Sequence, residues 1–254
     1  MKLFSRIFGE GKPIIILHGL FGMSDNWNSL AKQFAKEFNV HVVDLRNHGR
    51  SFHSDDFSYN YMSEDVENYI DVKGLHKPII IGHSLGGKVA MNLCTRFEKH
   101  IKKLIVVDIA PRYYSVDFHK NILDILSNIS IKEISSRNEI DEKLSNDIKE
   151  FSIRQFLMKN LYRNSDKEFC WRFNIPVLRN KLDNISNAEF IENEIHTPTL
   201  FIRGKKSNYI NEADEELIQK FFINSKIVTV ENAGHWVHAE QPNLFFESVM
   251  KFIN

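Results

Sequence analysis

The chain has few cysteines, no excess of positive or negative charge and no long apolar run. Only two of the 254 residues are cysteines, Cys94 and Cys170, and they form no Cys-x-x-Cys pair. Neither a disulfide framework nor a structural zinc site is therefore predicted, and we expect two reduced, buried thiols. The 33 basic and 33 acidic residues cancel. No overall field draws the protein to nucleic acid or to an anionic membrane, so neither is expected as a partner.

The longest apolar runs lie around Pro13–Leu17 and Pro78–Ile81. Both are far shorter than the ~20 residues that a transmembrane helix needs. The first residues, Met1–Arg6, include no long apolar stretch before a small-residue cleavage site, so they do not resemble a secretory signal. The sequence therefore predicts a cytoplasmic protein.

What the chain does contain is an alternation of short apolar runs and helical patterns up to residue 110, which is typical of a parallel sheet. The length suits one large α/β domain, or a domain with an insertion. Strands are expected at residues 3–8, 14–17, 40–44, 79–82, 104–108, 199–203 and 227–230, and helices at 25–38, 62–75, 85–97 and 242–253. The middle strands are apolar throughout, as in a sheet covered by helices on both faces.

This alternation stops at Pro111, and from residue 116 to about 193 the pattern is helical and polar, with no convincing strand. Extra core scaffolding is one interpretation. A helical cap inserted between two core strands is favoured, because the strands on either side look like members of one sheet. We therefore divide the chain into an α/β core, residues 1–111 and 196–254, and a helical cap, residues 112–195.

The most informative segment is Gly82-His83-Ser84-Leu85-Gly86, which follows an apolar strand and precedes a helix. In this G-x-S-x-G arrangement the serine occupies a sharp, strained turn, so Ser84 is exposed at the carboxyl end of the sheet as a candidate nucleophile. A glycine-rich structural turn is the alternative. The backbone N–H of Leu85, at the start of the helix, is a candidate oxyanion donor. The N–H of Leu20, in the turn after an earlier strand, is the second.

A serine nucleophile needs a base, and His235 follows the last predicted strand on the side of the sheet expected for Ser84. Most of the eleven histidines are interpreted as packed or surface residues. His18 and His83 are expected to hold backbone turns by hydrogen bonds. No metal site and no cofactor are predicted. Phe21 and Trp236, beside these motifs, are expected to line the substrate pocket.

Five motifs together resemble the α/β-hydrolase superfamily, and within it the YbfF-type bacterial esterases. They are His18–Gly22, Asp44–Ser51, Gly82–Lys88, Asp108–Pro111 and Gly234–Trp236. The resemblance implies an α/β-hydrolase fold, in which a mostly parallel sheet is flanked by helices. It also implies hydrolysis of carboxylic esters or thioesters through an acyl-enzyme, with Ser84 as nucleophile and His235 as base. Asp44 has a structural role in the family.

A serine nucleophile and a histidine base need an acidic residue as the third member of a catalytic triad. In this chain the position of that acid departs from the common pattern. Many members carry an aspartate three residues past a glycine after the penultimate strand, where this chain has Ser207. A serine cannot stabilise an imidazolium as a carboxylate does. Asp108 ends the preceding core strand at the same edge of the sheet, so we assign it as the acid, with capping of the turn into Pro111 as the alternative.

The sequence thus predicts a serine hydrolase of carboxylesterase type that acts on small-molecule esters or thioesters with small to medium acyl chains. Ser84 argues against dehalogenases and epoxide hydrolases, which use aspartate at this position. Perhydrolases and C–C bond hydrolases keep the serine and remain alternatives. A ligand-binding protein of the same fold is an alternative of another class. The physiological substrate and the oligomeric state are left open.

Overall fold

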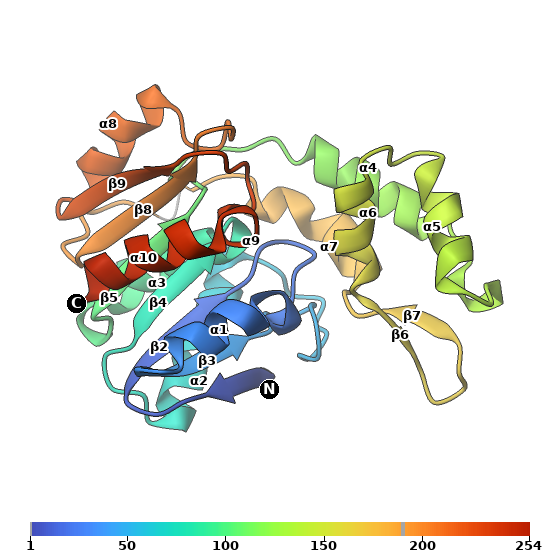
Figure 1. Ribbon diagram of the computed structural model, residues 1–254, viewed down its shortest axis with the longest axis horizontal. Helices are drawn as coiled ribbons and strands as arrows, with labels where there is room; N and C mark the ends of the chain where they lie inside the picture. The colour runs from blue at the N-terminus through green and yellow to red at the C-terminus, as the bar shows by residue number, and fades with distance from the viewer. Residues whose placement is uncertain (1, 189–190) are drawn as a thin grey trace.

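The computed structural model describes residues 2–188 and 191–254, which form a seven-stranded sheet with helices on both faces (Figure 1). The strand order is β1-β3-β2-β4-β5-β8-β9. β1 is antiparallel to β3, and the other neighbouring strands are parallel. The strands are β1 Ser5–Phe8, β2 Lys12–Leu17, β3 Phe38–Val43, β4 Ile79–His83, β5 Lys103–Val107, β8 Thr199–Gly204 and β9 Ser225–Val230. The predicted mostly parallel sheet is confirmed.

Two layers of helices cover this sheet. Helices α1 and α10 pack on one face, and α2, α3 and α8 pack on the other. Ile14 and Ile16 of β2 belong to the first layer's core and Ile15 to the second, and all three are fully buried. Successive strand side chains point to opposite faces, so a strand covered on both faces must be apolar throughout. The core helices are α1 Asn28–Phe34, α2 Tyr59–Lys73, α3 Leu85–Phe97, α8 Glu212–Phe221, α9 Val237–Glu240 and α10 Pro242–Ile253, with 3-10 turns η1 Ser24–Trp27 and η2 Glu98–His100.

Residues 112–195 leave the sheet after β5 and return before β8, which is the strand directly paired with β5. Figure 1 shows their helices grouped beside the core. The elements of this segment are α4 Asp117–Ser127, η3 Ile131–Glu133, α5 Arg137–Ser145, α6 Phe151–Met158, β6 Leu161–Arg163, β7 Phe169–Trp171, α7 Ile175–Lys181 and η4 Leu182–Ile185. The segment is thus mainly helical and is inserted between neighbouring strands.

Three sequence-based expectations were wrong. The inserted segment holds an antiparallel hairpin, β6–β7, whose turn is closed by the Asn164 side chain accepting from Asp166 N and Glu168 N at 3.0 and 2.9 Å. The expected helix at 25–38 is a 3-10 turn followed by seven helical residues, because β3 already begins at Phe38. Cys94 is buried as expected, but Cys170 is only partly buried.

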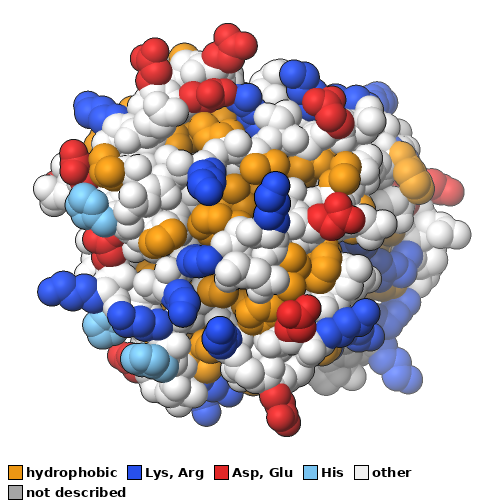
Figure 2. Space-filling model, turned by 60° about the vertical axis from the view of Figure 1, so that its left-hand side comes forward, with side chains coloured by type: hydrophobic (Ala, Val, Ile, Leu, Met, Phe, Trp, Pro, Cys, Tyr) orange, Lys and Arg blue, Asp and Glu red, His pale blue; other side chains and the backbone are white. Residues whose placement is uncertain are grey.

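No helix in the described ranges is both long and apolar enough to cross a membrane. Figure 2 views a face on which basic, acidic and hydrophobic side chains all occur. This mixture accords with a net charge of zero.

Candidate active site

Ser84 lies in the turn between β4 and α3 in a strained backbone conformation, with φ 51° and ψ −114°. Its neighbours must be small. A Cβ added to Gly82 would lie 2.2 Å from the carbonyl oxygen of Gly86, and one added to Gly86 would lie 2.4 Å from that of Leu17. The turn is tied to the next strand by a 3.0 Å hydrogen bond from Ser84 N to Val107 O. Positive φ in a non-glycine residue costs about 1–3 kcal/mol and is typical of functional sites.

Asp108 follows β5 and is completely buried. Its Oδ2 lies 2.7 Å from Nδ1 of His235, which comes from the loop after β9. A buried carboxylate accepts at this distance, so the imidazole N–H donates to it and the opposite ring nitrogen is left as an acceptor. The structure therefore joins two of the three residues that the sequence singled out.

Two further groups hold the Asp108 carboxylate. The backbone N–H of Gly204 donates to Oδ1 at 3.0 Å, and the hydroxyl of Ser207 donates to Oδ2. Both donors come from the end of β8 and the loop that follows it. These two hydrogen bonds satisfy the oxygens of a carboxylate that is shut off from solvent.

Two residues that the sequence did not assign to His235 also contact it, one at the ring and one at the backbone. Tyr209 stacks on its ring with a centroid distance of 3.8 Å and an interplanar angle of 19°. Nε2 of His83 lies 2.9 Å from the backbone oxygen of His235. For Tyr209 the only sequence signal is its position two residues after Ser207, because stacking between distant loops leaves no local pattern.

A cavity of about 220 Å³ is lined by both Ser84 and His235. The two residues predicted to line a pocket, Phe21 and Trp236, are also in its wall. The core contributes residues from the loops after β2, β4 and β9. The inserted segment contributes side chains of α4 and α6, namely Phe118, His119, Ile122, Ile153, Phe156 and Leu157. The cavity therefore lies between the sheet and the inserted helices.

The backbone around Ser84 carries the two predicted donors. Helix α3 begins at Leu85, and the first N–H groups of an α-helix lack intrahelical partners. The loop holding Leu20 passes close to the serine, since a Cβ added to Gly19 would lie 3.4 Å from the Cβ of Ser84. Leu20 itself also lines the cavity.

Other histidines near the site have structural contacts. His18 accepts a 3.0 Å hydrogen bond from Leu45 N through Nε2, and His83 holds the loop of His235. Burial lowers the pKa of His18 to about 4 and that of His83 well below its usual value of 6.5. Both are therefore neutral at pH 7, as turn-holding residues can be. In the described parts of the chain, no group of three or more His, Cys, Asp or Glu residues is arranged to hold a metal ion.

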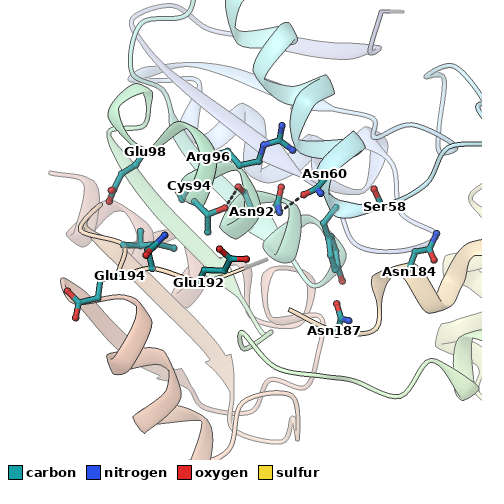
Figure 3. Close-up of a pocket in the computed structure, with 14 residues that line it drawn as sticks. Ser58, Asn60, Asn92, Cys94, Arg96, Glu98, Asn184, Asn187, Glu192 and Glu194 are labelled. Atoms are coloured by element: carbon teal, nitrogen blue, oxygen red, sulfur yellow. Dashed lines mark hydrogen bonds between the residues drawn. The ribbon is translucent and has the colours of Figure 1, made fainter. Parts of the chain in front are cut away.

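A polar hollow of about 530 Å³ lies away from Ser84, between the start of α2, the end of α3 and the return toward β8 (Figure 3). Asn92 donates to Asn60 at 3.1 Å in its wall. Its only thiol, that of Cys94, has a pKa raised by burial, which disfavours the nucleophilic thiolate. The described residues that line it include no histidine. This hollow lacks the groups for nucleophilic catalysis.

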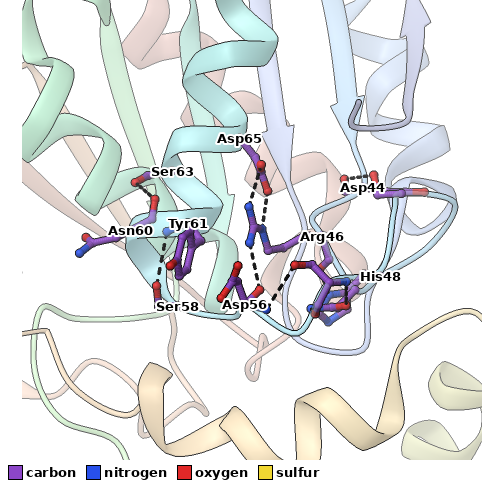
Figure 4. A network of polar contacts seen from close by, with 12 residues as sticks. Asp44, Arg46, His48, Asp56, Ser58, Asn60, Tyr61, Ser63 and Asp65 are labelled. Atoms are coloured by element: carbon purple, nitrogen blue, oxygen red, sulfur yellow. Dashed lines mark hydrogen bonds and ion pairs between the residues drawn. The ribbon is translucent and has the colours of Figure 1, made fainter. Parts of the chain in front are cut away.

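The Asp44–Ser51 motif forms a network of hydrogen bonds and ion pairs near the start of α2 (Figure 4). Asp44 accepts from Ser24 N at 2.5 Å and from Arg50 N at 2.8 Å. Arg46 pairs with both oxygens of Asp65, at 2.5 and 2.9 Å. These contacts engage the charged side chains of Asp44 and Arg46. The motif therefore holds the shape of its loop and has no evident part in the chemistry.

Residues 12–242 match the family model of the alpha/beta hydrolase fold. The chain belongs to this family. It is 38% identical over 247 residues to the sn-1-specific diacylglycerol lipase ABHD11 of Mus musculus, covering 94% of this chain and 80% of that one. It is 34% identical over 245 residues to esterase YbfF of Escherichia coli, covering 96% and 94%. A solved structure, a marine microorganism esterase, matches with 42% identity and a TM-score of 0.96 over 99% of both chains.

The resemblance to YbfF-type esterases that the sequence motifs carried is therefore confirmed, as is the α/β-hydrolase fold.

Proposed function

We propose that this chain hydrolyses carboxylic esters or thioesters of small to medium acyl chains through an acyl-enzyme formed on Ser84. The chain is a carboxylesterase-type hydrolase, the class to which the names of its relatives point. The observation that carries the serine mechanism is the 2.7 Å contact between His235 and the buried Asp108, with His235 and Ser84 in the wall of one cavity.

In the first half of the reaction His235 takes the proton of the Ser84 hydroxyl while Oγ attacks the ester carbonyl. The carbonyl oxygen becomes an oxyanion, which the N–H groups of Leu20 and Leu85 stabilise. Asp108 stabilises the imidazolium. The intermediate then expels the alcohol or thiol, which receives the proton from His235, and the acyl group stays on Ser84.

In the second half a water molecule gives its proton to His235 and attacks the acyl carbon. Collapse of this second intermediate returns the proton to Oγ and releases the carboxylic acid. His235 serves as base and then as acid in each half. The residues present supply every proton transfer in this cycle.

We further propose that residues 112–195 act as a cap on a core made of residues 1–111 and 196–254. Support comes from the cavity wall, which residues of α4 and α6 share with Ser84. Such a cover screens the acyl-enzyme from bulk water and restricts which substrates enter. A cytoplasmic location and the absence of a nucleic-acid partner stay predictions.

A fluorophosphonate probe tests the proposal, because it labels only an activated serine. We expect stoichiometric labelling of Ser84, found by peptide mass spectrometry, and hydrolysis of p-nitrophenyl butyrate that stops as labelling is completed. A folded protein that binds small esters but is neither labelled nor active is a ligand-binding protein of this fold instead.

A further inference from the structure

A second cavity adjoins Ser84. It measures about 50 Å³ and shares four wall residues with the cavity of 220 Å³: Leu20, Ser84, His119 and Tyr209. The rest of its wall includes Ile109, Val116 and Leu182, all buried. The site therefore divides at the serine into two spaces, which we name the large branch and the small branch.

The two branches differ in their relation to His235. Within the described residues, His235 lines the large branch and is absent from the wall of the small branch, whereas Leu20 and Leu85 are both in the small branch's wall. The small branch thus adjoins Ser84 and the first residue of α3 but not the imidazole, while Leu20 lines both branches.

This asymmetry orients an ester. At the tetrahedral carbon, one bond leads to Ser84 Oγ, one to the oxyanion and one to the leaving oxygen. The fourth leads to the acyl chain. The leaving oxygen must take its proton from His235, so the alcohol or thiol lies on the histidine side, in the large branch. The acyl chain then extends from Ser84 into the space that His235 does not line, which is the small branch.

The volumes of the two branches limit the sizes of the acyl chain and of the alcohol. The small branch, of about 50 Å³, has room for a short chain only. The large branch is more than four times larger, and its wall carries Ile122, Ile153 and Phe156. Each methylene buried against such side chains adds to binding.

We propose, resting on the serine hydrolase function above, that the acyl group occupies the small branch and the leaving group the large one. The preferred substrates are then esters of short carboxylic acids with bulky apolar alcohols. Lengthening the acyl chain from butyryl to octanoyl lowers activity, and lengthening the alcohol increases it.

Two ester series measure the two branches separately. In the first, p-nitrophenol is the constant leaving group and the acyl chain grows from acetyl through butyryl to octanoyl. We expect kcat/KM to fall at least tenfold from butyrate to octanoate. In the second, acetate is constant and the alcohol grows from ethanol to octanol, and we expect kcat/KM to rise at least tenfold.

A matched pair of variants then assigns the effects to their cavities. Val116→Ala widens the small branch and should raise the octanoate-to-butyrate ratio at least fivefold. Ile153→Ala, which touches only the large branch, should leave that ratio within twofold and change the octyl-to-ethyl acetate ratio instead. Circular dichroism and thermal unfolding check that both variants fold.

The proposal is overturned if the wild type prefers octanoyl over butyryl esters and Val116→Ala leaves that preference unchanged. The proposal is also overturned if Ile153→Ala changes the octanoate-to-butyrate ratio and Val116→Ala changes the octyl-to-ethyl acetate ratio. That result would mean that the acyl chain lies in the large branch. Failure of the serine mechanism looks different, since neither series would then be hydrolysed and no fluorophosphonate would label Ser84.

Discussion

The hydroxyl of Ser207 donates a hydrogen bond to Oδ2 of Asp108. The same oxygen faces Nδ1 of His235 at 2.7 Å. Ser207 stands at the position where the resemblance to the superfamily predicts the acid. The chain thus has the carboxylate one strand earlier, and the residue at the more usual position supports it through a hydrogen bond.

Replacing Asp108 by Asn should lower kcat by up to ~10⁴ with the fold intact, because an amide favours the wrong tautomer of His235. Ser207→Ala removes one hydrogen bond to a charged group and should cost only about tenfold. Steady-state kinetics on p-nitrophenyl butyrate measures both effects.

Asp214→Asn is the matched control. Asp214 pairs with Arg112 at 2.7 Å and closes the first turn of α8 through its contacts with Asn211. Its loss should lower thermal stability and leave kcat within a few-fold. A crippled Asp214→Asn enzyme beside a nearly wild-type Asp108→Asn would move the acid to the later loop.

Ser84→Ala should reduce turnover by a factor on the order of 10⁶, and His235→Ala by about as much, because the two residues act as a unit. The double variant should be no worse than either single one. Hydrolysis of a short p-nitrophenyl ester is the measurement, with circular dichroism as the folding control. A folded Ser84→Ala protein that keeps a tenth of the activity contradicts the nucleophile assignment.

Stability should fall as the pH drops from about 6.5 to about 4. Burial lowers the pKa of His18 to about 4 and those of His48 and His238 to about 3. In this window the unfolded chain binds protons that the folded chain refuses, so the free energy of unfolding decreases as pH decreases. Urea unfolding at a series of pH values measures the slope.

His48→Asn serves as the comparison for this slope. An asparagine side chain does not titrate, and its amide can keep the hydrogen bond to Arg46 O that Nδ1 makes at 3.0 Å. The variant should lose less stability than the wild type between pH 6.5 and 4. Parallel curves for the two proteins would contradict the role given to His48.

Lys88 should make stability depend on pH in the alkaline range. Its side chain is buried, Nζ donates to Arg112 O and to Asn187 O, and burial lowers its pKa from 10.5 to about 7. Between these values the unfolded chain binds more protons, so stability rises with pH. The Tm of the wild type should therefore rise relative to that of Lys88→Met between pH 7 and pH 10. An unchanged difference in Tm would contradict a neutral Lys88 in the folded state.

The sequence predicted best the helices and strands that a local residue pattern determines. The helix expected at 85–97 matches α3 because a continuous apolar strand, two glycines and a serine mark its start. The strands of β6–β7 were missed because three residues are too few to establish an alternation. Tyr209 and the support from Ser207 were missed because contacts between loops depend on strand order, which no local pattern encodes. The roles of Ser84, Asp108 and His235 stay proposals.

The insertion between β5 and β8 also affects how the chain is made. Asp108 and the backbone N–H of Gly204 that it binds are 96 positions apart, so β5 can pair with β4 on one side but cannot gain β8 on the other until the whole insertion has been synthesised. During that interval the nascent chain exposes the unpaired edge of an apolar strand, which can pair with other chains. Ribosomal pausing or premature termination within residues 112–195 should therefore yield aggregates rather than a folded intermediate.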